Sequence, residues 1–593
     1  MMSKTNAIYC RYQNFIERIV FPFILVIYPL LRIRLGIDMA DTTYSLSNFQ
    51  YFPYMDGTWM VATFLANVVG NLFMHLPFGG KLMGIYFYTA LVQSMAALAV
   101  YEAFRRSDRS AGRIPMPLVF AGEIIALGLC WCPSTVLYNY LTYLFMTVGI
   151  LLLYRGILKE DRRYYVAAGA CLGANVAVRM PNVVQTALIV AVWYGTAVRG
   201  RKWQQAVRDT LWCIAGYVAG FGVPFAAICI KYGAGAYPAM IQTMFAMTEK
   251  ATDYKPSAML TGMFSDYIIG LFWMVFAGIC MAGGWLLFML QRRLFPGKKS
   301  VAGLCGFVYT AVLLVLLRFY WGRGVFNFLY YDFGSIYYPV VLFLLTAVFT
   351  AVYCLCKKSV KAEQKILAVL VLVQILVTPL GGNNQLYPII NNLFIVVPFV
   401  LWVWYGQLTA VAGMPLILLL VFILIQSVGF HLRFSFQDGR NGEARDTLLT
   451  VPDKAAGIYT NQDNAACLEE LAEYAQQARL TGREVILYGE IPGLGYFLDM
   501  PSALSTFWPD LDSYRMVEYE RDMEQLGTPP VVIVSSSIAA YLNEDADGMN
   551  WFGAEKEKLD QDEKLQILGE YMKAYSYQEG FSNARYVVYV TGR

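Results

Sequence analysis

The sequence predicts a polytopic α-helical membrane protein with a C-terminal extracytoplasmic α/β domain. Of its 593 residues, 58% are hydrophobic and only 15% are charged, whereas a soluble domain has about 25% charged residues. The charge is also unevenly divided: residues 433–593 hold 14 Lys/Arg and 27 Asp/Glu, and the residues before them hold 32 and 15. A basic membrane part, 1–431, is therefore expected to precede an acidic domain, 432–593.

Thirteen apolar stretches predict the membrane helices, because about 20 mostly apolar residues span the hydrocarbon core. They lie near 16–34, 81–102, 114–133, 136–154, 164–180, 183–198, 210–230, 265–290, 301–319, 337–356, 366–380, 389–407 and 411–430. Residues 45–78 are apolar and aromatic but carry Asn67, Asn71 and His75, so we expect interfacial helices there. The alternative, an extra span at 59–77, would invert every later loop.

The loop charges orient these spans. With the N-terminus in the cytoplasm, the inner loops hold 23 of the 32 basic residues of the membrane part. This agrees with the excess of Lys and Arg on the cytoplasmic side of membrane proteins. Thirteen spans then place the acidic domain outside the cell membrane.

The acidic domain mixes helix and strand patterns. Residues 467–475 form an amphipathic helical pattern, and 484–488, 530–534 and 585–590 are rich in the Val, Ile and Tyr typical of strands. Residues 489–495 follow a strand but lack the G-x-G-x-x-G pattern, so they predict no nucleotide site. Acceptor recognition and a scaffold role remain equally open for this domain.

Composition excludes two classes of function. Nucleic-acid binding is not expected, because the one soluble domain is acidic and the basic residues flank membrane spans. A His-rich zinc site is excluded because the chain has only two histidines, His75 and His431.

A set of charges on the outer side of the membrane carries the functional prediction. Nine basic residues lie there against the positive-inside bias: Arg32, Arg34, Lys81, Arg179, Lys231, Lys250, Lys255, Arg318 and Arg323. Seven acids share that side: Asp38, Asp41, Asp56, Glu249, Asp253, Asp266 and Asp332. Interfacial salt bridging and snorkelling explain any single member, but the whole set predicts a site that handles an anion.

The segment Gly36–Tyr44 is the sharpest local feature of this side. It follows the first span directly and contains Asp38 and Asp41 beside hydroxyl residues. One interpretation is helix capping, with Asp41 or Thr42 as the N-cap of an interfacial helix; the other is a catalytic carboxylate.

The order of these features resembles the GT-C superfamily of integral-membrane glycosyltransferases, which includes the family-39-like protein O-mannosyltransferases, the lipid A aminoarabinose transferases and the catalytic subunit of oligosaccharyltransferase. The similar parts are an Asp-containing outer loop, a second span running into Arg105 and Arg106, and a small-residue span at 173–182 that ends in Arg-x-Pro. The chain departs from the family in having Thr42 where Glu commonly follows the Asp. It also lacks the Trp-Trp-Asp signature, which speaks against N-glycan transfer.

The resemblance implies transfer of a sugar from a polyprenyl-phosphate donor to a glycan, lipid or protein acceptor on the outer face. A carboxylate would act as general base. Direct displacement of the phosphate would invert the anomeric centre. We expect Asp41 in that role, with Asp38 second. The leaving phosphate would need Arg or Lys, and a groove among the apolar helices would hold the lipid tail.

The remaining candidates follow from position. Arg318 and Arg323 lead for the donor phosphate because they follow the ninth predicted span with aromatic residues between them. The other phosphate candidates are Arg179, Lys255 and Lys81. The candidates for sugar or acceptor binding are Tyr44, Asn383, Asn384 and Asp332. Asp41, Asp38 and Asp332 could together hold Mg²⁺ or Mn²⁺, and metal dependence stays open.

Two other classes of function compete with an enzyme. A transporter or lipid flippase predicts internal repeats and ionisable residues near the bilayer midplane, whereas no repeat is evident and the charges gather at the outer edge. A sensor or assembly protein with a non-catalytic membrane part is the third interpretation.

Overall fold

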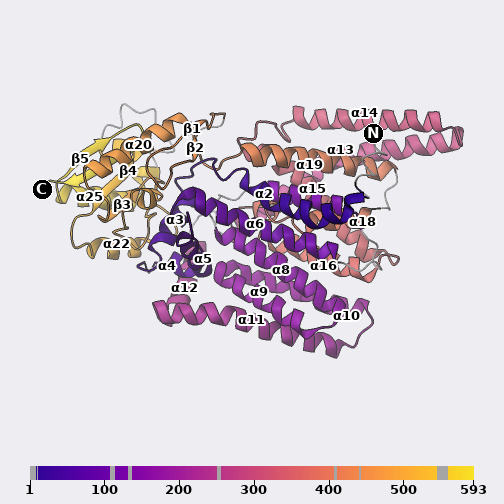
Figure 1. Ribbon diagram of the computed structural model, residues 1–593, viewed down its shortest axis with the longest axis horizontal. Coiled ribbons are helices and arrows are strands. Elements are labelled where there is room, and N and C mark those ends of the chain that lie inside the picture. The colour runs from indigo at the N-terminus through magenta and orange to yellow at the C-terminus, as the bar shows by residue number, and fades with distance from the viewer. Residues whose placement is uncertain are drawn as a thin grey trace.

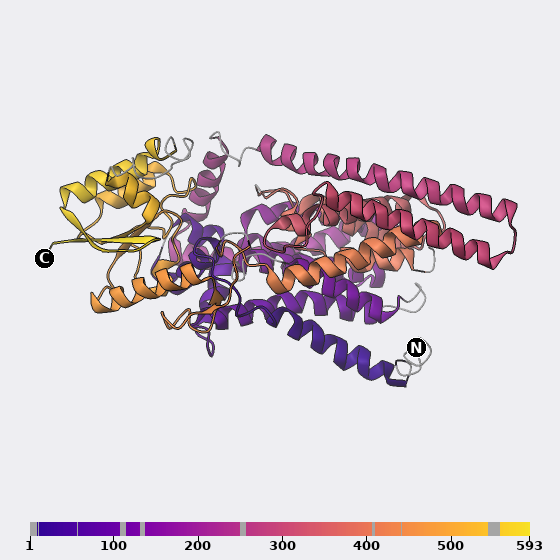
Figure 2. The same ribbon diagram turned by 90° about the horizontal axis from the view of Figure 1, so that it is seen from above.

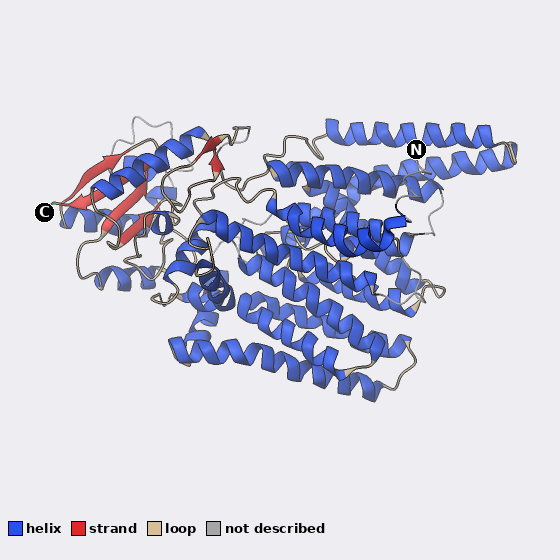
Figure 3. Ribbon diagram, viewed as in Figure 1, coloured by secondary structure: helices blue, strands red, loops and turns tan. Residues whose placement is uncertain are grey.

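The computed structural model describes Tyr9 and residues 11–55, 57–106, 114–130, 137–249, 256–382, 384–405, 410–439, 442–543 and 558–592. It consists of a body of long helices and, at one end of the long axis, a sheet with its own helices (Figures 1 and 3). The chain crosses from the body to the sheet after the last long helix.

The body contains long helices joined by short connections. In chain order these elements are η1 (Ile16–Val20), α2 (Phe21–Leu30), α3 (Asp41–Tyr51), α4 (Thr58–Ala62), α5 (Phe64–Met74), α6 (Leu82–Arg105), α7 (Met116–Leu129), α8 (Leu137–Lys159), α9 (Arg162–Val178), η3 (Met180–Ile189), α10 (Val190–Val198), α11 (Trp203–Tyr232), α12 (Ala236–Glu249), α13 (Pro256–Leu294), α14 (Lys299–Gly322), η4 (Phe333–Ser335), α15 (Tyr337–Cys356), α16 (Ala362–Val377), α17 (Tyr387–Ile390), α18 (Val396–Trp404) and α19 (Ala410–Arg433).

Nine helical segments among the described residues are long and apolar enough to cross a membrane. They coincide with nine of the thirteen predicted spans. The other four predicted spans fall on α7, α9, α16 and α18, which are shorter helices of 14, 17, 16 and 9 residues. The structure therefore confirms a mostly helical membrane body, and the count of thirteen spans stays a prediction.

One predicted span differs in its local conformation. Residues 180–189 form the 3₁₀ helix η3 before the chain continues as α10, where the sequence predicts an ordinary membrane helix at 183–198. Polar side chains explain the difference: buried Asn182 donates to Thr142 Oγ1 at 2.7 Å, and buried Gln185 accepts from Asn175 at 2.8 Å. These contacts favour the tighter helix, because a long 3₁₀ run seldom persists without outside support.

Basic residues gather in the turns at one end of the body. The turn between α13 and α14 and the turn between α10 and α11 lie at the end opposite the sheet (Figures 1 and 2). These turns carry Lys298, Lys299, Arg199, Arg201 and Lys202. Helices α3, α4 and α5 lie at the other end, which we call the sheet-side end of the body (Figure 1).

Helices α3 and α5 form a tight pair at the sheet-side end. Gly70 of α5 lies directly on the ring of Phe49 in α3, since a Cβ at Gly70 would stand 2.4 Å from the Cγ atom of that ring. Helices are thus present within 45–78, although the first begins four residues earlier, at Asp41, and their place at the membrane interface stays a prediction.

The C-terminal part holds the strands β1 (Thr447–Leu448), β2 (Tyr459–Thr460), β3 (Val485–Tyr488), β4 (Val531–Ser535), β5 (Tyr577–Ser582) and β6 (Tyr586–Thr591). The main sheet has the order β3-β4-β6-β5, in which β3 and β4 are parallel and the other pairs are antiparallel. Its helices are α20 (Gln462–Gln477), α21 (Leu494–Phe497), α22 (Met516–Glu524), α23 (Ser536–Leu542) and α25 (Glu563–Ala574). The three predicted strands correspond to β3, β4 and β6.

The sheet is covered on both faces, which explains why β3 is apolar at every position. Ile486 and Tyr488 pack with Tyr519 and Leu565 on one face. Val485 and Leu487 belong to the cluster that continues into the helical body. One face of the sheet is thereby joined to the body through a shared apolar core.

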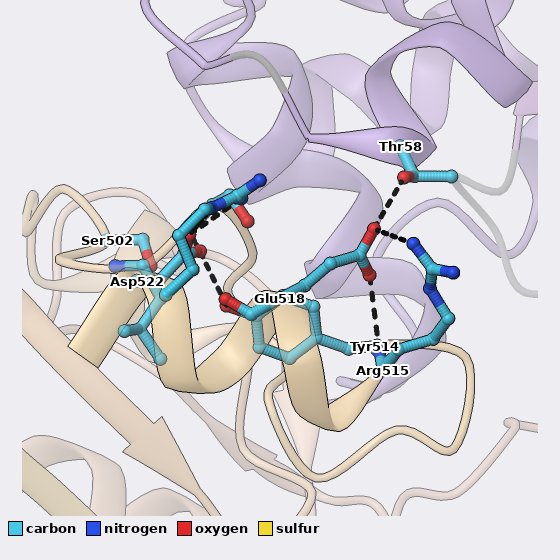
Figure 4. A network of polar contacts seen from close by, with 9 residues as sticks. Thr58, Ser502, Tyr514, Arg515, Glu518 and Asp522 are labelled. Atoms are coloured by element: carbon cyan, nitrogen blue, oxygen red, sulfur yellow. Dashed lines mark hydrogen bonds and ion pairs between the residues drawn. The ribbon is translucent and has the colours of Figure 1, made fainter. Parts of the chain in front are cut away.

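Polar contacts reinforce this junction. Glu518 at the start of α22 accepts hydrogen bonds from the backbone and side chain of Arg515, at 3.2 and 3.3 Å, and from Thr58 of α4 at 3.5 Å (Figure 4). Asp522, one turn further along α22, accepts from Tyr514 at 2.5 Å. Helix α22 thus contacts the body through Glu518 and binds the loop that precedes it through Asp522.

Candidate functional site

Asp38 and Asp41 lie in one turn at the sheet-side end, but their roles differ. The buried Asp38 carboxylate accepts hydrogen bonds from the backbone N–H groups of Ala40 and Thr42 at 2.9 and 2.6 Å. Asp38 therefore satisfies a free amide at the start of α3, and the expectation that Asp41 or Thr42 is the N-cap is wrong. Asp41 is the first residue of α3, and its side chain is partly exposed.

Both carboxyls hold their protons more tightly than an ordinary aspartate. Burial, with the added charge of Asp41, raises the pKa of Asp38 to about 7. Burial, with the added charge of Glu490, raises the pKa of Asp41 to about 6. A carboxylate whose pKa lies near neutral pH is suited to general base catalysis.

Glu490 belongs to a loop of the C-terminal part that packs onto this turn. The N–H of Gly493 donates to Met39 O at 3.2 Å, and the Ser47 hydroxyl donates to Pro492 O at 3.0 Å. A Cβ at Gly493 would lie 2.1 Å from Thr43 Oγ1, so this close approach requires glycine. The loop 489–493 is thus fixed against the start of α3.

The same loop brings a further acid to the site. The backbone N–H of Glu490 donates to Asp510 Oδ2 at 3.0 Å, and Glu490 has a positive φ of 60°. That conformation is costly for a residue other than glycine, and such residues often occur at functional sites. Burial raises the pKa of Asp510 to about 6. The sequence identified neither acid, because no local pattern marks them.

Aromatic side chains border the carboxylates. The rings of Tyr44 and Trp508 meet edge to face at 5.6 Å, and the Tyr44 hydroxyl lies 3.1 Å from Thr506 Oγ1. Tyr44, predicted to bind sugar or acceptor, therefore stands one helical turn from Asp41. Trp508 is an additional aromatic group at this place.

Lys81, predicted to bind phosphate, has a carboxylate partner. Its ammonium lies 2.6 Å from Asp453 in an exposed ion pair. The neighbouring Lys454 is more buried and pairs with Asp499, and it donates to Gln50 of α3 at 2.8 Å. These two lysines tie the C-terminal part to the body, and no contact among the described residues links Lys81 to Asp41.

Arg318 and Arg323 lie at the sheet-side end of α14. Their guanidinium groups stand over the rings of Trp321 and Phe319 at 4.8 and 5.5 Å. No hydrogen bond or ion pair of the described residues joins either arginine to the Asp38–Asp41 turn. Both guanidinium groups thus lie over aromatic rings and do not contact the carboxylates of Asp38 and Asp41.

Arg179 approaches the polar loop between α16 and α17. It donates to Gly381 O at 3.0 Å and stands 5.8 Å from the ring centroid of Tyr138. Asn384 is exposed in this loop, and Asn383 and Lys255 lie outside the described residues. Asp332 is engaged in its own turn, where it accepts from Asn327 and from the Gly334 N–H at 3.0 and 2.8 Å.

A cavity of about 510 Å³ lies among α13, α14, α15 and α19. Its walls are almost entirely apolar. Tyr320 and Phe326 line the sheet-side end, and Tyr353 and Trp404 line the opposite end. Its volume and apolar walls suit a hydrocarbon chain.

Asp38, Asp41 and Asp332 do not gather as a metal site. Within the described residues, no group of three or more His, Cys, Asp or Glu side chains is placed to hold a metal ion. Asp332 is bound in the turn before α15, whereas the two other acids lie at the start of α3.

No protein-family model and no curated protein matches the chain. Among solved structures, the Archaeoglobus fulgidus oligosaccharyltransferase in complex with Zn and sulfate has a TM-score of 0.40 and 12% identity, covering 88% of this chain and 69% of that chain. The oligosaccharyltransferase AglB of the same organism, with an inhibitory peptide and a dolichol-phosphate, has a TM-score of 0.41 and 11% identity over 98% and 75%.

The arabinosyltransferase EmbB of Mycobacterium smegmatis is a third similar structure, with a TM-score of 0.33 and 13% identity. The alignment covers 69% of this chain and 41% of EmbB. These neighbours are GT-C membrane glycosyltransferases, the class that the sequence resembles.

Proposed function

We propose that the protein is a membrane glycosyltransferase that moves a sugar from a polyprenyl phosphate to an acceptor outside the membrane. The observation that carries the proposal is Asp41, a partly exposed carboxyl at the start of α3 whose pKa is raised to about 6 by burial and Glu490. The proposed topology has thirteen spans and places residues 432–593 on the extracytoplasmic side. The gathering of basic turns at the opposite end of the body supports that orientation.

In the proposed reaction Asp41 takes the proton of an acceptor hydroxyl. The hydroxyl oxygen forms a bond to the anomeric carbon as the bond from that carbon to the phosphate oxygen breaks, and polyprenyl phosphate leaves. Attack opposite the leaving group inverts the anomeric centre. Asp38 is bound to two amides, so its proposed role is to hold the turn on which Asp41 stands.

The donor must have a place for its lipid and a cation for its phosphate. The apolar cavity among α13, α14, α15 and α19 is suited to an isoprenoid chain, and Arg318 and Arg323 at the end of α14 remain candidates for the phosphate. Tyr44 stands one helical turn from Asp41 and is the aromatic candidate for the sugar or the acceptor, and the buried Trp508 packs edge to face against its ring. Whether sugar transfer depends on Mg²⁺ or Mn²⁺ is a question for the transfer assay.

The test is a screen of purified full-length protein in nanodiscs against polyprenyl-phosphate-linked hexoses and pentoses, with release of polyprenyl phosphate as the readout. We expect one donor to be consumed, a product of inverted configuration, and no turnover by Asp41→Asn. The control is Asp453→Asn, which removes an exposed carboxylate 2.6 Å from Lys81. ATP- or gradient-driven movement of lipid without bond cleavage would instead favour the alternative, a transporter or flippase.

A further inference from the structure

Three buried polar atoms at the sheet-side ends of α2 and α19 have no hydrogen-bond partner among the described residues. They are Tyr28 Oη, Arg32 Nε and His431 Nδ1. A buried polar atom without a partner destabilises the folded protein. Three such atoms in one place therefore indicate a site that a ligand completes.

The two helices hold these groups together. The rings of Tyr28 and His431 stack with centroids 4.3 Å apart, and His431 Nε2 lies 3.0 Å from Tyr28 O. A carbonyl only accepts, so Nε2 carries the proton, and Nδ1 in the neutral ring is free to accept from a hydroxyl. Arg32 donates to Phe434 O at 3.3 Å, which anchors one end of its guanidinium.

The charge of Arg32 is not neutralised by a neighbouring acid. No carboxylate of the described chain forms an ion pair with it, and its positive charge acts on Tyr28, Tyr86 and His431. A guanidinium with unused donors, beside a phenol hydroxyl, matches the oxygens of a phosphate. The ligand chemistry is therefore that of a phosphate group.

In the predicted topology the surface next to Arg32 faces the lipid bilayer. Phe23, Ile27 and Leu31 follow at helical spacing on one face of α2, and their side chains are 63%, 37% and 60% exposed. This apolar stripe leads along α2 directly to Arg32, which is itself partly exposed. A chain lying on the stripe would bring its headgroup to the guanidinium.

The site also adjoins the proposed base. Arg32 precedes Asp38 by six residues, and the charges of both reach Tyr86, whose hydroxyl donates to Gly36 O at 3.1 Å. Arg32 thus occupies the same turn region as the carboxylates, whereas Arg318 and Arg323 have no contact with it.

We propose that Arg32 and Tyr28 donate hydrogen bonds to the phosphate of a polyprenyl phosphate lipid and that His431 Nδ1 accepts one from its P–OH group, with the isoprenoid chain along the exposed face of α2. This inference rests on the proposed function and deepens it: it assigns the leaving phosphate to Arg32 in place of Arg318 and Arg323, and the isoprenoid chain to α2 in place of the cavity among α13, α14, α15 and α19. In that arrangement the arginine stabilises the departing phosphate while Asp41 takes the acceptor proton.

The experiment measures equilibrium binding of farnesyl phosphate to full-length protein in detergent, with inorganic phosphate and farnesol as the two other probes. We expect farnesyl phosphate to bind at least about tenfold more tightly than either, since both parts of the ligand have contacts. Equal binding of inorganic phosphate would overturn the lipid assignment, and equal binding of farnesol would overturn the phosphate assignment.

Variants locate the site. Arg32→Gln should weaken farnesyl phosphate binding about tenfold or more. The matched control is Arg34→Gln, because Arg34 already donates to Gly457 O at 2.9 Å and stands 5.1 Å from the Tyr459 ring. An equal loss in both variants, or a loss on Arg318→Gln instead of Arg32→Gln, would overturn the proposal.

Tyr28→Phe guards against misfolding as an explanation. It removes a buried hydroxyl that has no partner in the described protein, so the melting temperature should stay the same or rise while farnesyl phosphate binds more weakly. Unchanged binding would overturn the role of Tyr28. Binding needs no turnover, so Arg32-dependent binding without any sugar transfer would support this site and refute the proposed function.

Discussion

Replacing Asp41 with Asn should abolish sugar transfer and at the same time stabilise the protein at neutral pH. No described group donates a hydrogen bond to the Asp41 carboxylate, and burial with the charge of Glu490 raises its pKa from 3.8 to about 6. The folded protein therefore disfavours the ionised form. A neutral amide of the same shape removes that unfavourable charge.

The size of the expected stabilisation follows from the pKa shift of Asp41. A rise of about 2 units from 3.8 corresponds to a penalty of about 3 kcal/mol when Asp41 is ionised. This is an upper bound, because Asp41 is partly exposed. We expect the melting temperature of Asp41→Asn to be a few degrees above that of the wild type at pH 7.5.

The direction of the pKa shift fixes how stability changes with pH. Because the folded pKa of Asp41 is raised, the wild type loses stability as the pH rises from 3.8 to about 6, and the full penalty is present above that range. The difference in melting temperature between the wild type and Asp41→Asn should therefore be largest at pH 7.5 and shrink towards pH 4.

The assay is a thermal melt in detergent at several pH values, beside the transfer assay. Asp453→Asn is the control, since an exposed ion pair such as its pair with Lys81 contributes at most about 1 kcal/mol. A lower melting temperature of Asp41→Asn at pH 7.5 would refute the electrostatic reasoning. Retained sugar transfer would refute the assignment of the base.

Two further predictions concern the contacts between the C-terminal part and the body. Glu490→Gln should lower the pKa of Asp41 and move the acidic limb of the pH–rate profile to lower pH. The movement should be only roughly half a unit, because burial is the larger cause of the raised pKa. An unmoved limb would show that Glu490 does not act on the base. Lys454→Met should destabilise the protein by about 1–3 kcal/mol and so lower its melting temperature, since it leaves Asp499 and Gln50 without their shared ammonium. Protease should then cleave the junction between the C-terminal part and the body at a lower temperature. An unchanged melting temperature would count against a stabilising role of Lys454 at this junction.

Local patterns account for the parts of the fold that the sequence predicts. A membrane helix needs only a long apolar run, and β3, β4 and β6 are short runs of Val, Ile and Tyr, so both signals are contained in the segment itself. Strand β5 reads Tyr-Gln-Glu-Gly-Phe-Ser, and it was not predicted because its pattern is polar. It becomes a strand by pairing with β6 at the edge of the sheet.

The candidate site is predictable only in part for the same reason. Asp38 and Asp41 stand out because they directly follow a span. Glu490 and Asp510 do not, since the loop that carries Glu490 and contacts Asp510 packs against α3, whose Ser47 is 445 positions from Pro492. Arg32 was visible as one of nine outer cations, but only the structure shows that it lacks a carboxylate partner.

The two groups of the proposed site favour chemistry over transport. A carboxyl with raised pKa beside Glu490 and a guanidinium without an acidic partner lie in one turn region, yet no described ion pair joins Arg32 to Asp38 or Asp41. A purely structural arrangement would be expected to neutralise such charges by pairing them. Sugar transfer requires them apart, because the base must face the acceptor hydroxyl and the cation must face the phosphate on the opposite side of the anomeric carbon.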